Sequence, residues 1–332
     1  MTGNVKWSVF VILAIVLTSC APAATPTTAP AAPTTAPAAP KIIRIGISFP
    51  GESPYVTYQG RGVEDAAAAA GVEVTIVNAR WDPAAQSEQL RDLVARGVDA
   101  IAVMPMDAKA IVSVAAEIRA TYPDMPILNF NSPVYLADAE GAKNFIGFVG
   151  PSDEVVAQLM AVTLAEALGG KGNIMEVKGQ AGHIPTKIRD EAFREALEAY
   201  PDIKVIDAQN ADWDTNKAIS VTRDMITRNQ GNFQAIWAQD DMMAAGAVEA
   251  LKAAGYEKGE ILVGGGNAVK VAVDLIKEGW MYCTVMQDPY EEGGLVVQTL
   301  LRYLNGEKIP EITLLNQFVV SPENVDQIEP RF

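Results

Sequence analysis

Short apolar runs alternate with amphipathic patterns along the chain from Lys41 onward. The runs predict strands over residues 42–49, 72–79, 100–105, 126–131, 144–150, 173–179, 203–208, 234–239, 261–264 and 281–287. The patterns between them place apolar residues at helical spacing and predict helices, among them 108–121, 153–168 and 290–304. Continuous apolar strands separated by helices are typical of parallel sheets that are covered on both faces.

A glycine-rich break at 169–172 divides the alternating pattern into two similar series. Each series has about 100–130 residues, which is the usual size of one domain. The sequence therefore predicts an α/β protein of two doubly wound lobes with parallel sheets. The segment after the 290–304 helix is too short for a third domain, so we expect it to return to the first lobe.

The first 20 residues have the pattern of an export signal. Lys6 is followed by nine uninterrupted apolar residues, Val9–Leu17, which are too few to span a bilayer but fit a secretory signal peptide. The run ends in Leu-Thr-Ser-Cys at residues 17–20, which resembles the lipobox of bacterial lipoproteins and implies lipidation of Cys20. The alternative is a plain signal peptide with an incidental cysteine.

Residues 21–40 consist of nine Ala, six Pro and five Thr. This segment has no side chains that could form a core, and its prolines favour extended polyproline II geometry. We interpret it as a tether. Together with the signal and Cys20, it predicts an exported protein on the outer face of the cytoplasmic membrane, which contacts the membrane only through its lipid anchor.

Charge and residue counts exclude several classes of function. The 332 residues include 26 Lys and Arg against 41 Asp and Glu, and the net charge of −15 disfavours binding to nucleic acid. His183 is the single histidine of the sequence, so a multi-histidine metal site is impossible and a Ser–His–Asp centre would have to use it. We expect neither a metal nor a cofactor. Cys283 lies in an apolar run and is expected to be a small buried residue.

Polar and aromatic residues follow the predicted strands in both halves of the chain. In open α/β sheets, ligands bind beyond the carboxyl ends of the strands. The residues at these positions are Ser48, Ser53, Tyr55, Asn131, Ser132, Gln180, Asp212, Trp213, Gln239, Asp240, Asp241, Asn267 and Gln287. Amides and carboxylates pair with hydroxyl groups, and aromatic faces cover the C–H faces of rings, so the set favours a hydroxyl-rich ligand. The alternative is that these residues form ordinary polar loops.

Several segments resemble the ribose-type periplasmic binding proteins, the substrate receptors of bacterial ABC sugar importers. The most specific segments are KIRDEAF (187–193), NADWDTNKA (210–218), AIWAQDDMMAAGAVEALKAAG (235–255) and CTVMQDPYEEGG (283–294). The resemblance covers residues 41–332 and implies two Rossmann-like lobes that close on a sugar. It further implies a monomer that is not an enzyme and that delivers a neutral monosaccharide or polyol to an ABC permease.

The resemblance also implies where the lobes begin and end. The family joins its lobes by three crossings, which would fall near residues 150, 287 and 316. The N-terminal lobe would then comprise residues 41–150 with 288–316, and the C-terminal lobe residues 151–287 with 317–332.

The ligand-binding residues are implied position by position. The ring-stacking aromatic residues of the family fall on Tyr55 and Trp213, and its sugar-binding arginine falls on Arg189. Its polar positions fall on Ser53, Asn131, Ser132, Asp240, Asn267 and Gln287. Four of these, Asn131, Ser132, Asp240 and Asn267, differ from the ribose pattern, and Val56 replaces a second aromatic residue, which argues against ribose itself.

We expect Tyr55 and Trp213 to enclose the sugar ring and Arg189 to bind its oxygens. One carboxylate, Asp240, beside one guanidinium would leave the site nearly neutral. Alternatively, Arg189 lies on the surface of its helix in an ion pair with Glu191 or Glu195. His183 lies in a loop after a strand, where it would face the ligand, be solvated or cap a helix.

Two other classes of function stay open at this point, and a third is disfavoured. A signalling receptor of the same fold, feeding a chemoreceptor or sensor kinase, would bind its ligand in the same way, including autoinducer-type sugars. A secreted sugar-active enzyme would use Asp240 or Asp241, although adjacent residues at a strand-to-helix junction point in different directions. A repressor of the lactose-repressor type would need an N-terminal helix-turn-helix, where this sequence has the signal and the tether.

Overall fold

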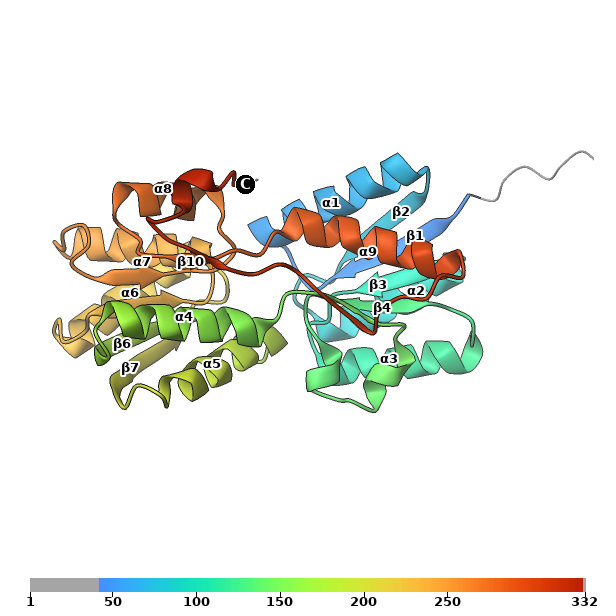
Figure 1. Ribbon diagram of the computed structural model, residues 1–332. Coiled ribbons are helices and arrows are strands. Elements are labelled where there is room, and N and C mark those ends of the chain that lie inside the picture. The colour runs from blue at the N-terminus through green and yellow to red at the C-terminus, as the bar shows by residue number, and fades with distance from the viewer. Residues whose placement is uncertain (1–41, 331–332) are drawn as a thin grey trace, which may run out of the picture. The chain divides into compact units, whose positions relative to one another are not determined.

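The computed structural model describes residues 42–330. The predicted signal peptide (1–20), its lipidation site Cys20 and the tether (21–40) lie outside the described residues. Residues 42–330 form two α/β lobes, each with a parallel sheet that has helices on both faces, which we call the first and second lobes (Figure 1). None of the helices in this range has the length and apolar character that a membrane crossing requires.

The first lobe has a six-stranded parallel sheet in the order β11-β5-β4-β3-β1-β2. Its strands are β1 (Arg44–Phe49), β2 (Glu73–Asn78), β3 (Ala100–Val103), β4 (Ile127–Phe130), β5 (Phe148–Gly150) and β11 (Ile312–Leu314). Its helices are α1 (Pro54–Ala70), α2 (Pro83–Ala95), α3 (Ala108–Thr121) and α9 (Pro289–Leu304), with short 3-10 turns η1 (Val134–Leu136) and η2 (Gly141–Asn144). Successive residues of β3 pack in different cores: Ala100 and Ala102 with α1 and α9, Ile101 and Val103 with α2 and α3.

The second lobe has the parallel order β7-β6-β8-β9. Its strands are β6 (Lys171–Lys178), β7 (Asp202–Asn210), β8 (Ala235–Ala238), β9 (Leu262–Gly264), β10 (Thr284–Val285) and β12 (Val319–Val320). Its helices are α4 (Asp153–Ala167), α5 (Ile184–Leu197), α6 (Thr215–Asn229), α7 (Asp241–Ala253) and α8 (Lys270–Glu278), followed by the 3-10 turn η3 (Val325–Gln327). The Trp237 ring of β8 stacks on Phe193 of α5, with 4.1 Å between ring centroids, whereas Ile236 packs with α6, α7 and α8.

The chain passes between the lobes where β5 leads to α4, where β10 leads to α9, and where β11 leads to β12. The final two strands therefore lie in different lobes: β11 beside β5, and β12 beside β10. The expectation of wholly parallel sheets is wrong at this one pair, because β10 and β12 are antiparallel. The reason is that β10 leads out of the second lobe and β12 leads back into it.

The predicted fold class is confirmed, and most element boundaries agree within a few residues. The helix predicted over 108–121 has those bounds, and the one predicted over 153–168 ends at Ala167. Two predicted strands are shorter than expected. The 281–287 run contributes only β10, and the 144–150 run begins its strand at Phe148, after the η2 turn.

Helices α1 and α9, far apart in the sequence, lie side by side on the first sheet (Figure 1). Their backbones are in close contact at two glycines. A Cβ atom on Gly62 would lie 2.1 Å from the carbonyl oxygen of Tyr290, and one on Gly293 would lie 2.1 Å from that of Gln59. Only glycine allows this approach, which holds the start of α9 against the start of α1.

We predict that Gly293→Ala lowers the free energy of unfolding by about 1–3 kcal/mol, because the added methyl group forces the two helices apart. Gly294→Ala is the matched control, since a Cβ at the next position meets no atom within 4 Å. The control should raise stability by about 0.5–1 kcal/mol, the usual gain for alanine over glycine in a helix. Urea denaturation measures both, and equal stabilities for the two variants would contradict this account of the packing.

Candidate functional site

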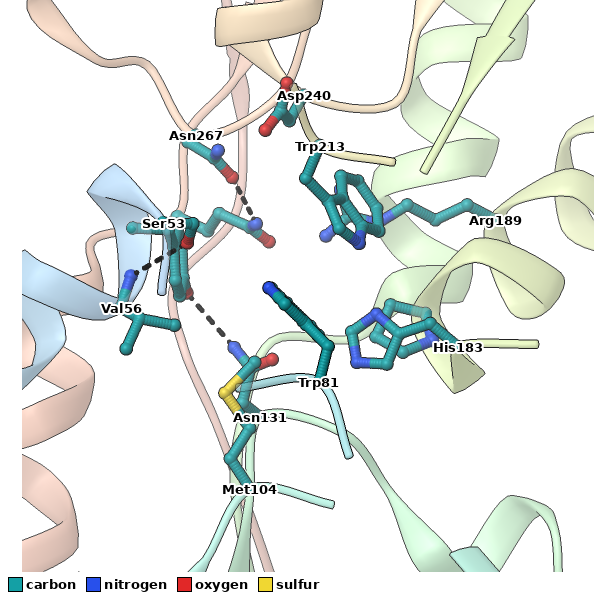
Figure 2. A pocket seen from close by; sticks show the side chains of 13 residues that line it. Ser53, Val56, Trp81, Met104, Asn131, His183, Arg189, Trp213, Asp240 and Asn267 are labelled. Atoms are coloured by element: carbon teal, nitrogen blue, oxygen red, sulfur yellow. Dashed lines mark hydrogen bonds between the residues drawn. The ribbon is translucent and has the colours of Figure 1, made fainter. Parts of the chain in front are cut away.

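A cavity with about 460 Å³ of empty space, part of it open to solvent, lies at the carboxyl ends of the strands and is lined from both lobes (Figure 2). Eight residues singled out in the sequence line it: Ser53, Tyr55, Asn131, Arg189, Trp213, Asp240, Asn267 and Gln287. Five further residues complete the lining: Val56, Trp81, Met104, His183 and Pro185.

The turns that follow the strands bring these side chains together. Ser53 and Asp240 are the N-caps of α1 and α7, and their side chains accept hydrogen bonds from the backbone N–H groups of Val56 and Met243. Asn131 directly follows β4 and has a left-handed backbone, with φ of 57°. Each residue is thus held at a strand-to-helix junction, so the cavity has a rigid frame of caps and turns.

Arg189 is the charged centre of the cavity wall. It projects from α5, is only 5% exposed, and donates from Nε to Asp153 Oδ1 at 2.8 Å. A second guanidinium N–H donates to the backbone carbonyl of Gln239, at the end of β8. These bonds use two of the five N–H donors of the guanidinium, which leaves donors that a ligand can occupy.

These contacts add a charge partner of Arg189 that the sequence did not indicate, Asp153 in the first turn of α4. Asp240 lines the same cavity as Arg189, as expected, whereas the alternative of a surface ion pair with Glu191 or Glu195 is wrong. Burial raises the pKa of the Asp153 carboxyl, and the charge of Arg189 and its hydrogen bond oppose this rise. Asp153 Oδ2 is buried without a hydrogen-bond partner among the described residues.

Asp240 and its neighbour Asp241 point in different directions, as expected. Asp240 lines the cavity, and burial raises its pKa to about 6, with the N–H of Met243 and the charge of Arg189 acting against burial. The carboxylate of Asp241 instead accepts from Thr284 Oγ1 at 2.6 Å and from the N–H of Val269 at 2.9 Å. Asp241 therefore ties α7 to the neighbouring turn and is not part of the cavity lining.

A buried carboxyl group supports the first-lobe side of the cavity. Glu292, in the first turn of α9, accepts from the Tyr55 hydroxyl at 2.7 Å and from Asn131 Nδ2 at 3.1 Å. Asn131 Nδ2 also lies 3.3 Å from the Tyr55 hydroxyl. Burial raises the pKa of Glu292 to about 8, and its bonds to Tyr55 and Asn131 lower it in part. Glu292, which does not line the cavity itself, thus holds the side chains of Tyr55 and Asn131 in place.

His183 lies at the back of the cavity and is 3% exposed. Burial, and secondly the charge of Arg189, lowers its pKa to about 3, so the imidazole is neutral at physiological pH. Ser132 and Gln180, both singled out in the sequence, do not line the cavity but contact His183. Ser132 Oγ lies 3.4 Å from His183 Nε2. The backbone carbonyl of Gln180 accepts a hydrogen bond from the backbone N–H of His183 at 3.2 Å.

The hinge crossing after β10 contributes an amide pair to the cavity. Gln287 Nε2 donates to Asn267 Oδ1, and Gln287 Oε1 lies 3.5 Å from Gln317 Nε2, in the last crossing. Gln317 Oε1 in turn accepts from the N–H of Ser152, in the first crossing. One chain of amides therefore connects the cavity to all three crossings.

Sequence reasoning missed Trp81, Asp153 and Glu292. A signal for Trp81 existed, because the pattern N-A-x-W-D occurs at both 78–82 and 210–214. Asp153 and Glu292 look like ordinary acidic residues in the first turn of a helix, and only folding shows their partners. Across residues 42–330 no three His, Cys, Asp or Glu side chains gather as a metal site would require. Cys283 is buried, as expected.

Comparison with known proteins finds relatives over most of the chain. It is 29% identical to the ribose import binding protein of Haemophilus influenzae over 259 residues, which cover 78% of this chain and 84% of the relative. It is 28% identical to the xylitol-binding protein of Mycolicibacterium smegmatis, covering 85% of this chain and 78% of the relative. It is 27% identical to the D-allose-binding periplasmic protein of Escherichia coli, covering 81% and 88%.

Solved structures agree with these relatives. A solute binding protein of an ABC transporter from Bacillus halodurans, with bound myo-inositol, is 26% identical with a TM-score of 0.79, covering 86% of this chain and 96% of that one. A periplasmic solute binding protein from Actinobacillus succinogenes, with bound D-allose, is 28% identical with a TM-score of 0.77, covering 86% and 100%. The family model for the periplasmic binding protein domain matches residues 45–308. The fold, the cavity between strand ends and this match agree: the chain belongs to the periplasmic binding protein family.

Proposed function

We propose that this protein is an extracytoplasmic receptor that captures a neutral monosaccharide or polyol between its two lobes and delivers it to an ABC permease. The observation that carries the proposal is the composition of the cavity wall. Aromatic rings lie next to amides, a hydroxyl, one guanidinium and one carboxylate, the set that hydroxyl groups and C–H faces require. The relatives named for ribose, xylitol and D-allose support the same ligand class.

The charges around the cavity favour an uncharged ligand over an anion. The positive charge of Arg189 is offset by Asp153, 2.8 Å away. Asp240 adds a second carboxylate, which is ionised at neutral pH because its pKa is about 6. A sugar acid or sugar phosphate would therefore bring its negative charge to a wall that has no uncompensated positive charge among its lining residues.

The same geometry argues against a sugar-active enzyme. Glycosidases use two carboxyl groups on either side of the bond that breaks. Asp240 is the one carboxylate among the lining residues of this cavity, because Asp241 is bonded to Thr284 and Val269 instead. Binding without chemistry is the function that this wall supports best.

We further propose that the mature protein is a monomer held at the outer face of the cytoplasmic membrane by lipid on Cys20, with residues 21–40 as its tether. The apolar run before Cys20 and the Ala/Pro/Thr composition after it support the anchor and the tether. Fractionation of cells that express Cys20→Ala tests the anchor. Soluble release of the variant is the expected result, and retention in the membrane would contradict it.

We predict that a thermal-shift screen separates neutral ligands from their anionic counterparts. D-ribose, D-allose, xylitol and myo-inositol form the neutral group, and D-ribonate and D-ribose 5-phosphate the anionic one. At least one neutral compound should raise the melting temperature in a concentration-dependent way, because a ligand that binds only the folded state stabilises it. Stabilisation by the anions alone would contradict the proposed ligand class.

We predict that Glu292 makes the protein less stable as the pH rises. Its folded-state pKa of about 8 exceeds the usual 4.5. Between these values the unfolded chain loses a proton that the folded chain keeps, so the contribution of Glu292 to stability is complete below about pH 4.5 and is lost by about pH 8. The slope is at most about 1.4 kcal/mol per pH unit.

Glu292→Gln should remove this contribution. The difference in unfolding free energy between the variant and wild type should therefore shift steadily in favour of the variant from pH 5 to pH 8. Asp241 and Glu176, whose pKa burial also raises to about 8, affect both proteins equally. Glu291→Gln is the control, because Glu291 is the exposed neighbour in the same turn. Parallel curves of unfolding free energy against pH for wild type and Glu292→Gln would show that Glu292 is not the titrating group.

A further inference from the structure

The same local structure holds a tryptophan at the cavity in each of the two lobes. In the first lobe, Trp81 lies in the N-A-R-W-D segment that begins at the last residue of β2. In the second lobe, Trp213 lies in the N-A-D-W-D segment that begins at the last residue of β7. In both, the final aspartate caps the next helix: Asp82 Oδ1 accepts from the N–H of Ala84 at 2.9 Å, and Asp214 Oδ1 from that of Lys217 at 2.7 Å.

The contacts of the first residue in each segment are also the same. Asn78 Nδ2 donates to the carbonyl of Gly51 at 2.8 Å, and Asn210 Nδ2 donates to that of Gly179 at 2.6 Å. Both glycines follow the first strand of their lobe, β1 and β6, and both lie beneath an indole. A Cβ on either would come within 2.0 Å of the tryptophan ring above it. In each lobe, the absence of a side chain at the glycine thus allows the indole to pack directly on the backbone.

The backbone of both segments is held in an unusual conformation. Trp81 and Trp213 have φ of 63° and 60°, and the residues before them, Arg80 and Asp212, have φ of 53° and 55°. Left-handed backbone is disfavoured for bulky side chains, and such conformations gather at binding sites, where the surrounding contacts impose them. The strain is the same in both lobes, which indicates that both indoles serve one purpose.

The two indoles meet at His183. Its ring lies edge-on to Trp81 at 6.0 Å between centroids and edge-on to Trp213 at 5.9 Å. Figure 2 shows both indoles beside His183 in the wall of the cavity. Trp213 Nε1 and His183 Nδ1 are buried and have no hydrogen-bond partner among the described residues. This aromatic wall therefore offers flat apolar faces together with polar atoms that a ligand hydroxyl can satisfy.

We propose that Trp81 is a specificity-determining residue and that, with Trp213, it selects cyclic ligands over open-chain ones. The inference rests on the proposed function and narrows its ligand class to sugar rings and cyclitols. A closed ring presents flat C–H faces that an indole covers fully. An open-chain polyol has no such face, and it loses the rotation of its carbon chain when it is bound. Tyr55, whose hydroxyl is bonded to Glu292, closes another side of the cavity.

The variants Trp81→Asn and Trp213→Asn test the two indoles in the same way. Asparagine tolerates left-handed backbone, so each change removes the ring without adding strain. Trp280→Phe is the control, because this tryptophan does not line the cavity and its ring contacts Lys252. Trp81→Leu keeps apolar bulk without a flat face and replaces Trp81→Asn if thermal melts show that the latter does not fold.

The experiment is calorimetric titration with two pairs of probes: myo-inositol with D-sorbitol, and D-allose with allitol. Wild type should bind the cyclic member of at least one pair tenfold or more tightly than its open-chain counterpart. Each indole variant should weaken binding of that cyclic probe by roughly tenfold or more and reduce the preference for it. Trp280→Phe should change neither quantity.

Three other outcomes would overturn the inference. If wild type binds a cyclic probe and Trp81→Asn binds it within twofold as tightly, Trp81 has no role in selection, while the proposed function stands. If open-chain probes bind as tightly as cyclic ones, the ring preference is wrong, and the receptor function again stands. If no probe binds to wild type, the proposed ligand class fails and this inference fails with it.

Discussion

The site is organised by the need to neutralise one buried guanidinium. Arg189 is 5% exposed, and a charge at that depth is costly unless it is paired and hydrogen-bonded. Asp153 supplies the opposite charge from α4, and the carbonyl of Gln239 supplies an acceptor from the end of β8. Because these partners come from different elements, the guanidinium is fixed in direction before any ligand arrives. The donors that remain have a set geometry, which is a condition for selective binding of hydroxyl groups.

The neutralised guanidinium also decides what the rest of the wall can bind. With Asp153 beside Arg189, the cavity has no positive charge left for an anion, and Asp240 makes its lining more negative. Neutral His183 and the two indoles supply the apolar part of the wall. Glu292 supports Tyr55 and Asn131 from the first lobe, as Asp153 supports Arg189 from the second. Each lobe thus backs its ligand-facing side chains with a buried carboxyl group.

The fold could be predicted from the sequence because the periodicity and length of each apolar segment identify the strands and helices of a doubly wound sheet one by one. The strand ends could be predicted from the apolar runs, and seven of the lining residues follow from where those runs stop, whereas Arg189 was assigned through the family resemblance. Contacts between residues that are far apart in the sequence could not be predicted in this way. Asp153 and Glu292 are separated from their partners by 36 and 161 or more positions, and nothing in their own turns marks them as buried. Ser132 and Gln180 follow strands as lining residues do, yet the Ser132 hydroxyl lies against the His183 ring and Gln180 contacts the backbone N–H of His183 through its carbonyl.

The most direct test of the central claim, that a neutral ligand binds at Arg189, is calorimetric titration of a charge-balanced variant. Arg189→Ala combined with Asp153→Asn removes the donors and leaves no unpaired buried charge. Lys187→Ala changes an exposed residue of the same helix and serves as the control. The account predicts at least about tenfold weaker binding for the double variant, since hydrogen bonds to a charged group contribute about 1.5–3 kcal/mol, and unchanged binding for the control. A folded double variant that binds the wild-type ligand with wild-type affinity would place the binding site elsewhere.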